Sequence, residues 1–135
     1  MVLEWELFLH PAGVEAVRTM AARMVPGALV GPAAAMFCRH FRRQLRARGM
    51  ARHTAQTIAA KGKADLDAVE AILGDKPFIV ANRPSMADVS VYGLLGPMAA
   101  WLMRTPGADS IKSRPRLLGY LQRVAEARAE QRVAA

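Results

Sequence analysis

The strongest constraint on the fold is an uncharged stretch, residues 89–103, that directly follows Ser85-Met86-Ala87-Asp88. A serine followed three residues later by an acidic residue is the pattern of a capping box, in which the two side chains bind free amide groups at a helix start. The sequence therefore predicts a helix that begins at Ser85. The apolar residues of this stretch point in every direction around the helix, and such a helix is expected to be buried among others.

Helical patterns also occur on both sides of this central helix. Apolar residues three and four positions apart predict a helix over about residues 28–48, with arginines on its opposite face. A second helix is expected to begin at Thr54 and to end at Gly74. Pro115 fits the first position of a last helix, whose polar end after Ala125 is expected to fray.

The first 24 residues are expected to be helical with a break at Pro11-Ala12-Gly13, and a second break is expected at Val25-Pro26-Gly27. The chain has 135 residues, enough for one core, and its 53% apolar against 22% charged residues argue against disorder. Val, Ile and Thr are sparse beside Ala, Leu, Met and Arg, which favours helix. The sequence thus predicts an all-α fold, a single domain over residues 1–135 with about five helices around the buried central one.

Neither a secretion signal nor a membrane span is predicted. The first ten residues contain two acids where a secretion signal would be basic, and no apolar run reaches about 18 residues. The single cysteine, Cys38, cannot form an internal disulfide, which favours a reducing, cytoplasmic compartment.

Several segments of the chain, in the same order, resemble the C-terminal helical domain of cytosolic glutathione transferases. The loop Leu73-Gly74-Asp75-Lys76-Pro77-Phe78, followed by the capping box, resembles the start of the central helix in that domain. Residues 44–54 and 62–68 are more similar to the failed-axon-connections and metaxin-like branch, and residues 114–124 to its closing helix. The resemblance covers about residues 40–125.

This resemblance implies a function that depends on a second domain. Members of the family have an N-terminal thioredoxin-like domain that binds glutathione and activates its thiol, and this domain is expected to be absent here. The chain is then expected to be inactive alone, to bind no cofactor alone, and to supply a half-site for an apolar co-substrate. Four residues are expected to line this half-site: Phe41, Tyr92, Met98 and Trp101.

Two other classes of function remain open. One is a non-enzymatic interaction module, which forms a homodimer or binds a thioredoxin-like partner domain through the apolar surface that such a domain would cover. The other is a basic helical nucleic-acid binder, because the chain has a formal net charge of +8 and six arginines between Arg39 and Arg52. No aromatic residue interleaves the arginine face of the helix over about residues 28–48, so a solvated face or one that meets an acidic partner is favoured over nucleic acid.

The remaining chemically capable residues are better explained by structure than by catalysis. Ser85 and Asp88 are expected to cap the central helix. Asp65 falls inside the apolar stripe of the helix that begins at Thr54, so a buried carboxylate with a nearby partner, Arg52 or His53, is expected there.

Cys38 and the histidines are not expected to be reactive or to bind metal. Cys38 follows Met36 and Phe37, which favours a buried structural thiol over a nucleophile activated by arginines. No metal site is predicted, because the three histidines have no metal-ligand spacing. They are His10, His40 and His53.

Overall fold

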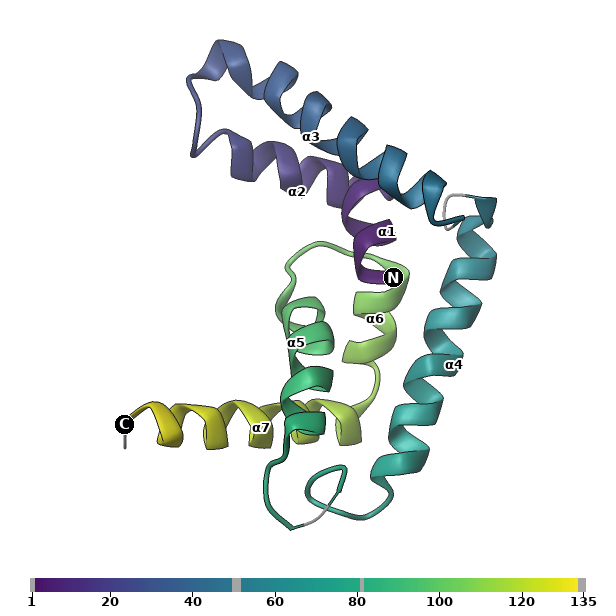
Figure 1. Ribbon diagram of the computed structural model, residues 1–135, viewed down its shortest axis with the longest axis vertical. Coiled ribbons are helices and arrows are strands. Elements are labelled where there is room, and N and C mark those ends of the chain that lie inside the picture. The colour runs from purple at the N-terminus through teal and green to yellow at the C-terminus, as the bar shows by residue number, and fades with distance from the viewer. Residues whose placement is uncertain (1, 50–51, 81, 134–135) are drawn as a thin grey trace. The chain divides into compact units, whose positions relative to one another are not determined.

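The computed structural model describes residues 2–49, 52–80 and 82–133. Within these residues the chain is all-α, with seven helices and no strand (Figure 1). The helices are α1 (Val2–Phe8), α2 (Pro11–Ala21), α3 (Gly27–Ala47), α4 (Ala55–Leu73), α5 (Met86–Ala100), α6 (Pro106–Lys112) and α7 (Pro115–Val133). No helix in this part of the chain is long and apolar enough to cross a membrane.

The all-α prediction is confirmed, although the number of helices and some of their ends differ from expectation. The break expected at Pro11-Ala12-Gly13 lies two residues earlier, at residues 9–10, and Pro11 begins α2 because proline fits the first helical position, where no intrahelical amide bond is needed. Pro106 begins the short α6 in the same way. The central helix ends at Ala100, before Met103, and α7 continues through its polar end to Val133.

Contacts divide the chain into two compact units. The first contains Met1–Lys61 and Met103–Gly107, and the second contains Gly62–Leu102 and Ala108–Ala135. The helix α4 begins in the first unit and continues into the second.

The first unit is built on α1, α2 and α3, which pack against one another. Its buried core consists of Trp5, Phe8, Val17, Ala34, Cys38, Leu45 and Ile58. The ring of Phe41 stacks on Phe8 with 4.1 Å between centroids, and Phe37 meets both rings edge-on. This aromatic cluster explains why α3 turns the side that carries Ala34, Cys38 and Leu45 toward α1 and α2.

Gly13 sets how closely α1 and α2 approach. A Cβ at this position would collide with the carbonyl oxygen of Glu6 and lie 2.7 Å from the Cα of Leu7. The two backbones can therefore cross at this distance only if position 13 carries no side chain.

A buried carboxylate holds the start of α6 in the same unit. Glu6, on α1, is 1% exposed. Its carboxylate accepts hydrogen bonds from the Thr105 hydroxyl and from the backbone amide of Gly107, each at 2.5 Å. A carboxylate satisfies the free amides at a helix start and offsets the positive end of the helix dipole.

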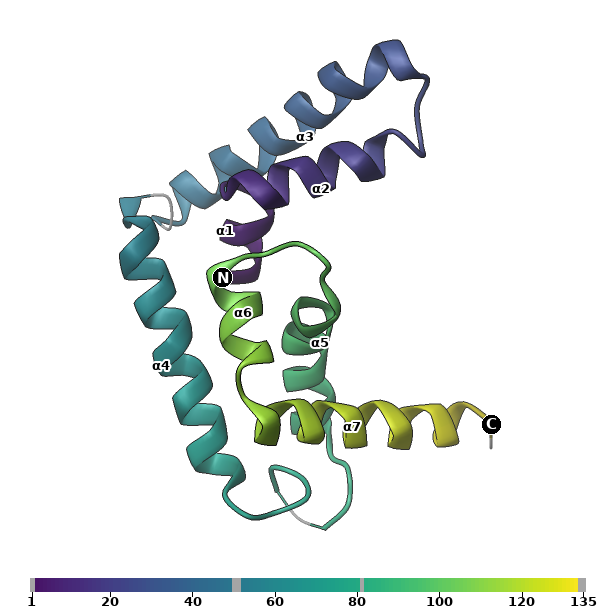
Figure 2. The same ribbon diagram turned by 180° about the vertical axis from the view of Figure 1, so that it is seen from behind.

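The second unit is built around α5 and α7, which pack against each other (Figures 1 and 2). Its buried residues come from α4 to α7: Leu66, Leu73, Asp88, Met98, Ala108, Ile111, Leu117, Tyr120, Leu121 and Val124. Four of these ten residues lie on α7, all of them in its first half, and the other three helices supply two each.

The helix α5 is not enclosed on all sides within this unit, which differs from the expectation of a buried central helix. Only Asp88 and Met98 are buried on it. Met86 is 77% exposed, Leu94 58% and Val89 36%. The physical reason is that α7 is its principal packing neighbour here, and one neighbour covers one side of a helix that is apolar all round.

Candidate functional site

A network centred on the carboxylate of Asp88 fixes the start of α5. Asp88 is 0% exposed. One oxygen, Oδ2, accepts hydrogen bonds from the backbone amide of Ser85 at 2.8 Å and from its hydroxyl at 2.6 Å. Ser85 is the N-cap residue, and both halves of the capping box are present. The capping pair therefore holds the first turn of the helix in place.

The other oxygen of Asp88 joins α5 to two further segments. Oδ1 accepts hydrogen bonds from the backbone amide of Ile79 at 2.8 Å and from the Tyr120 hydroxyl at 2.9 Å. Ile79 lies in the connection before α5, and Tyr120 lies on α7 and is 0% exposed. One carboxylate thus connects the loop, the helix start and α7.

The pKa values of Asp88 and Tyr120 reflect this arrangement. Burial works to raise the pKa of Asp88, but the hydrogen bonds from Ile79, Ser85 and Tyr120 outweigh it and hold the pKa below its ordinary value of 3.8. Burial, and then the hydrogen bond to Asp88, raise the pKa of Tyr120 well above 10.0. The carboxylate is therefore ionised and the phenol neutral at ordinary pH, which suits a structural hydrogen bond.

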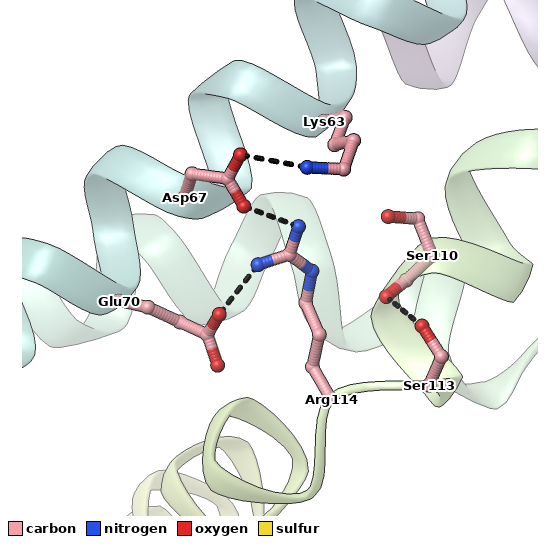
Figure 3. Close-up of polar contacts among 6 residues, drawn as sticks. All are labelled: Lys63, Asp67, Glu70, Ser110, Ser113 and Arg114. Atoms are coloured by element: carbon pink, nitrogen blue, oxygen red, sulfur yellow. Dashed lines mark hydrogen bonds and ion pairs between the residues drawn. The ribbon is translucent and has the colours of Figure 1, made fainter.

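A second polar cluster joins α4 to the start of α7. Figure 3 shows the Arg114 guanidinium between the carboxylates of Asp67 and Glu70, with 2.5 Å to each nearest oxygen. Lys63 also donates to Asp67 at 3.1 Å. The hydrogen bond from Arg114, and then that from Lys63, lower the pKa of Asp67. The side chain of Arg114 is only 13% exposed, so this cluster fixes α7 against α4.

The apolar residues of α5 form the best candidate for a binding surface. The exposed side chains of Met86, Val89 and Leu94 lie on it. The Tyr92 ring lies against Gly96, where a Cβ would approach it to 3.1 Å, and the Arg128 guanidinium lies 5.0 Å from its centroid. A rigid helix with exposed apolar side chains provides a surface for an apolar ligand or partner.

The four residues predicted to line the half-site lie in two units. Tyr92 and Trp101 are half-buried, and Met98 is 4% exposed, so its side chain already belongs to the core of the second unit. Phe41 lies in the aromatic cluster of the first unit. That these four residues line one pocket remains a prediction.

A depression of about 250 Å³ lies elsewhere in the second unit. It is lined by Leu73, Gly74, Asp75, Lys76, Pro115, Arg116, Gly119 and Arg123. Its cations already hold backbone carbonyls: Lys76 donates to Ile79 at 2.8 Å and Arg123 to Pro77 at 3.2 Å. These contacts fasten the connection before α5, and none of the four predicted lining residues borders the depression.

The prediction that Asp65 is buried is wrong, because this residue is exposed. The buried side of α4 turns along its length, from Ile58 near its start to Leu66 and Leu73 near its end. At 3.6 residues per turn, Asp65 lies about 90° from Leu66 and Leu73. The apolar stripe predicted from the sequence assumed one buried direction along the whole helix, and on that assumption it included Asp65.

The other titratable candidates occupy structural or surface positions. Cys38 is buried in the core of the first unit. His10 accepts from the amide of Ala12 at the start of α2, and His40 hydrogen-bonds Gln44. His53 is exposed. Among the residues that the structure describes, no group of three or more His, Cys, Asp or Glu side chains is placed to hold a metal ion.

Three contributors to these clusters were missed by sequence reasoning. Tyr120 reads as one apolar residue of the last helix, and Glu6 as a surface acid near the start of the chain. Arg114 precedes Pro115 and could have been noticed as a cation just outside a helix start, where the dipole does not favour it. A cation at that position needs acidic partners to offset the unfavourable dipole, and Asp67 and Glu70 are those partners.

Comparison with known proteins agrees with the helical architecture. Residues 35–123 match the family described as "Glutathione S-transferase, C-terminal domain". The isoprene-epoxide–glutathione S-transferase of Rhodococcus sp. (strain AD45) is 33% identical over 76 residues, which cover 56% of this chain and 32% of that protein. The matched part therefore spans about a third of the relative. No solved structure matches the chain. Because the family match covers more than half of the residues, the chain belongs to the glutathione S-transferase C-terminal domain family.

Proposed function

We propose that this chain supplies the apolar co-substrate half-site of a glutathione-transferase-like protein. The observation that carries the proposal is the exposed apolar side of α5, with Met86, Val89 and Leu94 at its surface. A small protein seldom leaves several large apolar side chains exposed on one rigid helix unless that surface binds something.

The way in which α5 is held supports a binding role. The Asp88 network fixes its first turn to α7, and Met98 anchors its last turns in the core. A ligand that meets this surface therefore meets side chains whose backbone is already ordered, so little conformational entropy is lost on binding.

The substrate class that we propose is a small apolar electrophile. The name of the Rhodococcus relative describes transfer of glutathione to an isoprene epoxide, a short hydrocarbon chain with a strained ring of two carbons and one oxygen. In such a reaction the glutathione sulfur attacks a ring carbon, the carbon–oxygen bond breaks, and the oxygen takes up a proton. The part of this chain is to hold the hydrocarbon and exclude water. The resemblance assigns glutathione binding and thiol activation to a thioredoxin-like domain.

A pair of matched variants tests this role. Leu94 on α5 and Ile72 on α4 are each 58% exposed, so Leu94→Glu and Ile72→Glu add the same charge at equal exposure. Binding of a short alkyl epoxide is measured by displacement of a hydrophobic fluorescent dye. We expect Leu94→Glu to weaken binding by at least about tenfold, since burial of a leucine is worth that much, and Ile72→Glu to have little effect. Equal effects of the two variants would contradict the proposal.

A conjugation assay tests whether glutathione binding and thiol activation depend on a thioredoxin-like domain. We expect the purified chain alone to be retained poorly on immobilised glutathione and to conjugate a chlorinated aromatic substrate no faster than buffer. Retention together with conjugation would show that the chain contains its own activating residue.

The same surface supports a second candidate, a non-enzymatic interaction module. The exposed Met86 and Leu94 would then pack against a second copy or against a thioredoxin-like partner domain. Light scattering separates the two functions: a dimer that Leu94→Glu dissociates favours the module, whereas a monomer that binds the epoxide favours the half-site. We place the chain in the failed-axon-connections and metaxin-like branch and in the cytoplasm as further parts of this proposal.

A further inference from the structure

The outward face of α3 changes character along its length. Its first half exposes apolar residues, with Leu29 at 54% and Met36 at 72%. The exposed residues of its second half are mostly arginines, Arg39, Arg42, Arg43 and Arg46, together with His40 and Ala47. The opposite face is buried in the core of the first unit through Ala34, Cys38 and Leu45. The outward face is therefore available to a partner along the whole helix.

The helix α2 extends the apolar half of this surface. Figures 1 and 2 show α2 and α3 side by side, joined by a turn at residues 22–26. Near this turn Met20 is 50% exposed and Met24 76%. The hairpin, residues 11–48, thus has an apolar tip formed by Met20, Met24 and Leu29, and an arginine-rich base on α3.

The charge of the hairpin is strongly one-sided. Seven arginines lie between Pro11 and Arg48, all exposed, and Glu15 is the only acidic residue there. Arg48 pairs with Glu4 at 3.4 Å, but Arg39, Arg43 and Arg46 have no ion pair among the described residues. A surface with this charge attracts polyanions and repels a second copy of itself.

We propose that the α2–α3 hairpin docks onto a bilayer that contains anionic phospholipid. The tip residues Met20, Met24 and Leu29 enter the interface, and Arg39, Arg43 and Arg46 bind lipid phosphates. This inference is independent of the proposed function, which rests on α5 in the other unit.

The dimensions fit a peripheral attachment. At 1.5 Å per residue, the apolar first half of α3, from Gly27 to Met36, is about 14 Å long. Interfacial helices bury their apolar side chains to a depth of about 5–10 Å. The tip can therefore enter the headgroup region while the second half of α3 stays at its surface. Arg18 and Arg23, which lie closer to the tip, can extend their charged ends toward the phosphates.

Nucleic acid is a poorer partner for this surface. Binding of single strands uses several exposed aromatic rings on which bases stack, but of the two phenylalanines of the hairpin only Phe37 is exposed, at 42%, and Phe41 stacks on Phe8. Exposed methionines and a leucine beside the arginines would gain nothing from a phosphate backbone, whereas an acyl-chain interface shields them from water.

Vesicle sedimentation of the full chain tests the proposal. The vesicles are phosphatidylcholine alone or with about one third phosphatidylserine, at about 0.15 M salt. The test variant is Arg39→Gln/Arg43→Gln/Arg46→Gln. The control is Arg83→Gln/Arg123→Gln/Arg128→Gln, which removes the same charge from exposed positions outside the hairpin. Because each basic residue near an anionic surface strengthens partition about fivefold, we expect the test variant to lose about a hundredfold and the control far less.

A second measurement examines the tip. Met24→Cys is labelled with an environment-sensitive dye, with Gln122→Cys on α7 as the control, while the buried Cys38 is protected from labelling. We expect a blue shift with phosphatidylserine vesicles for the label at position 24 alone. Equal losses by the two triple variants, a shift at position 122 alone, or binding to duplex DNA with none to vesicles would overturn the proposal.

Discussion

Replacing Asp88 by asparagine should destabilise the second unit strongly, although the side chain keeps its size. The Asp88 carboxylate accepts four hydrogen bonds, from the Ile79 amide, the Tyr120 hydroxyl, and the amide and hydroxyl of Ser85. An asparagine has one acceptor oxygen and one amide group in these positions. The side-chain amide group of asparagine is itself a donor, and it would face two of the donors that now bind a carboxylate oxygen. Two of the four hydrogen bonds are therefore lost.

The expected loss of stability follows from these contacts. A buried hydrogen bond to a charged group contributes about 1.5–3 kcal/mol, so the loss of two costs about 3–6 kcal/mol. A typical domain is stable by about 5–15 kcal/mol. For a domain of this size, such a loss lowers the melting temperature by roughly 10–20 °C. A domain of typical stability therefore stays folded at room temperature in this variant but melts well below the parent.

Two measurements locate the effect. Urea and thermal denaturation, followed by circular dichroism, give the change in free energy of unfolding. Native-state hydrogen exchange then shows where protection is lost. We expect faster exchange in α5 and α7, and unchanged exchange in α1 to α3, because the network lies within the second unit. The control is Asp65→Asn on the exposed side of α4, which should change stability by less than about 0.5 kcal/mol.

The pH dependence provides a separate check on the same residue. Because the pKa of Asp88 is lower in the folded chain than its ordinary 3.8, its ionised form stabilises the fold above that pH. This stabilisation is lost as the pH falls through the folded pKa, and Asp88→Asn should lack this part of the acid sensitivity. A variant as stable as Asp65→Asn, or with the acid sensitivity of the parent, would refute the assignment of Asp88 as the centre of the network.

Further substitutions test other contacts. Tyr120→Phe should cost about 1.5–3 kcal/mol in urea denaturation, because it removes one hydrogen bond to a buried carboxylate. Ser85→Ala should cost about 1 kcal/mol, and a non-additive double variant with Tyr120→Phe would show that both act through Asp88. Gly13→Ala should cost about 3 kcal/mol because its Cβ meets the backbone of α1, whereas Gly31→Ala, which meets nothing within 4 Å, should be neutral or stabilising. Arg114→Met should lower the melting temperature by a few degrees, and high salt should shrink this difference.

The features that were predictable from sequence are those that depend on neighbouring residues. Ser85 and Asp88 are three residues apart, so their capping role is visible in the sequence. Thr54 accepts from the amide of Thr57 at 3.2 Å, and Gly74 adopts a φ of 55° after α4, both as local patterns indicate. Pro115 likewise begins α7 as expected.

The features that were not predictable depend on contacts between distant segments. Tyr120 reaches Asp88 across 32 residues, and Glu6 reaches Gly107 across 101. Neither partner is marked by a local pattern. The exposure of α5 has the same origin. The apolar sequence of a helix indicates that it packs against other helices, but it does not indicate how many of them its own unit provides. The error at Asp65 arose because a periodic stripe assumes one fixed buried direction along the helix.

Two-dimensional NMR of the labelled chain, during titration with a short alkyl epoxide, shows whether α5 presents the apolar surface on which a co-substrate binds. We expect the largest shifts at residues of α5 near Tyr92 and Leu94, with saturation at a single affinity. Shifts confined to α1–α3, or the same shifts in the Leu94→Glu variant, would contradict this expectation.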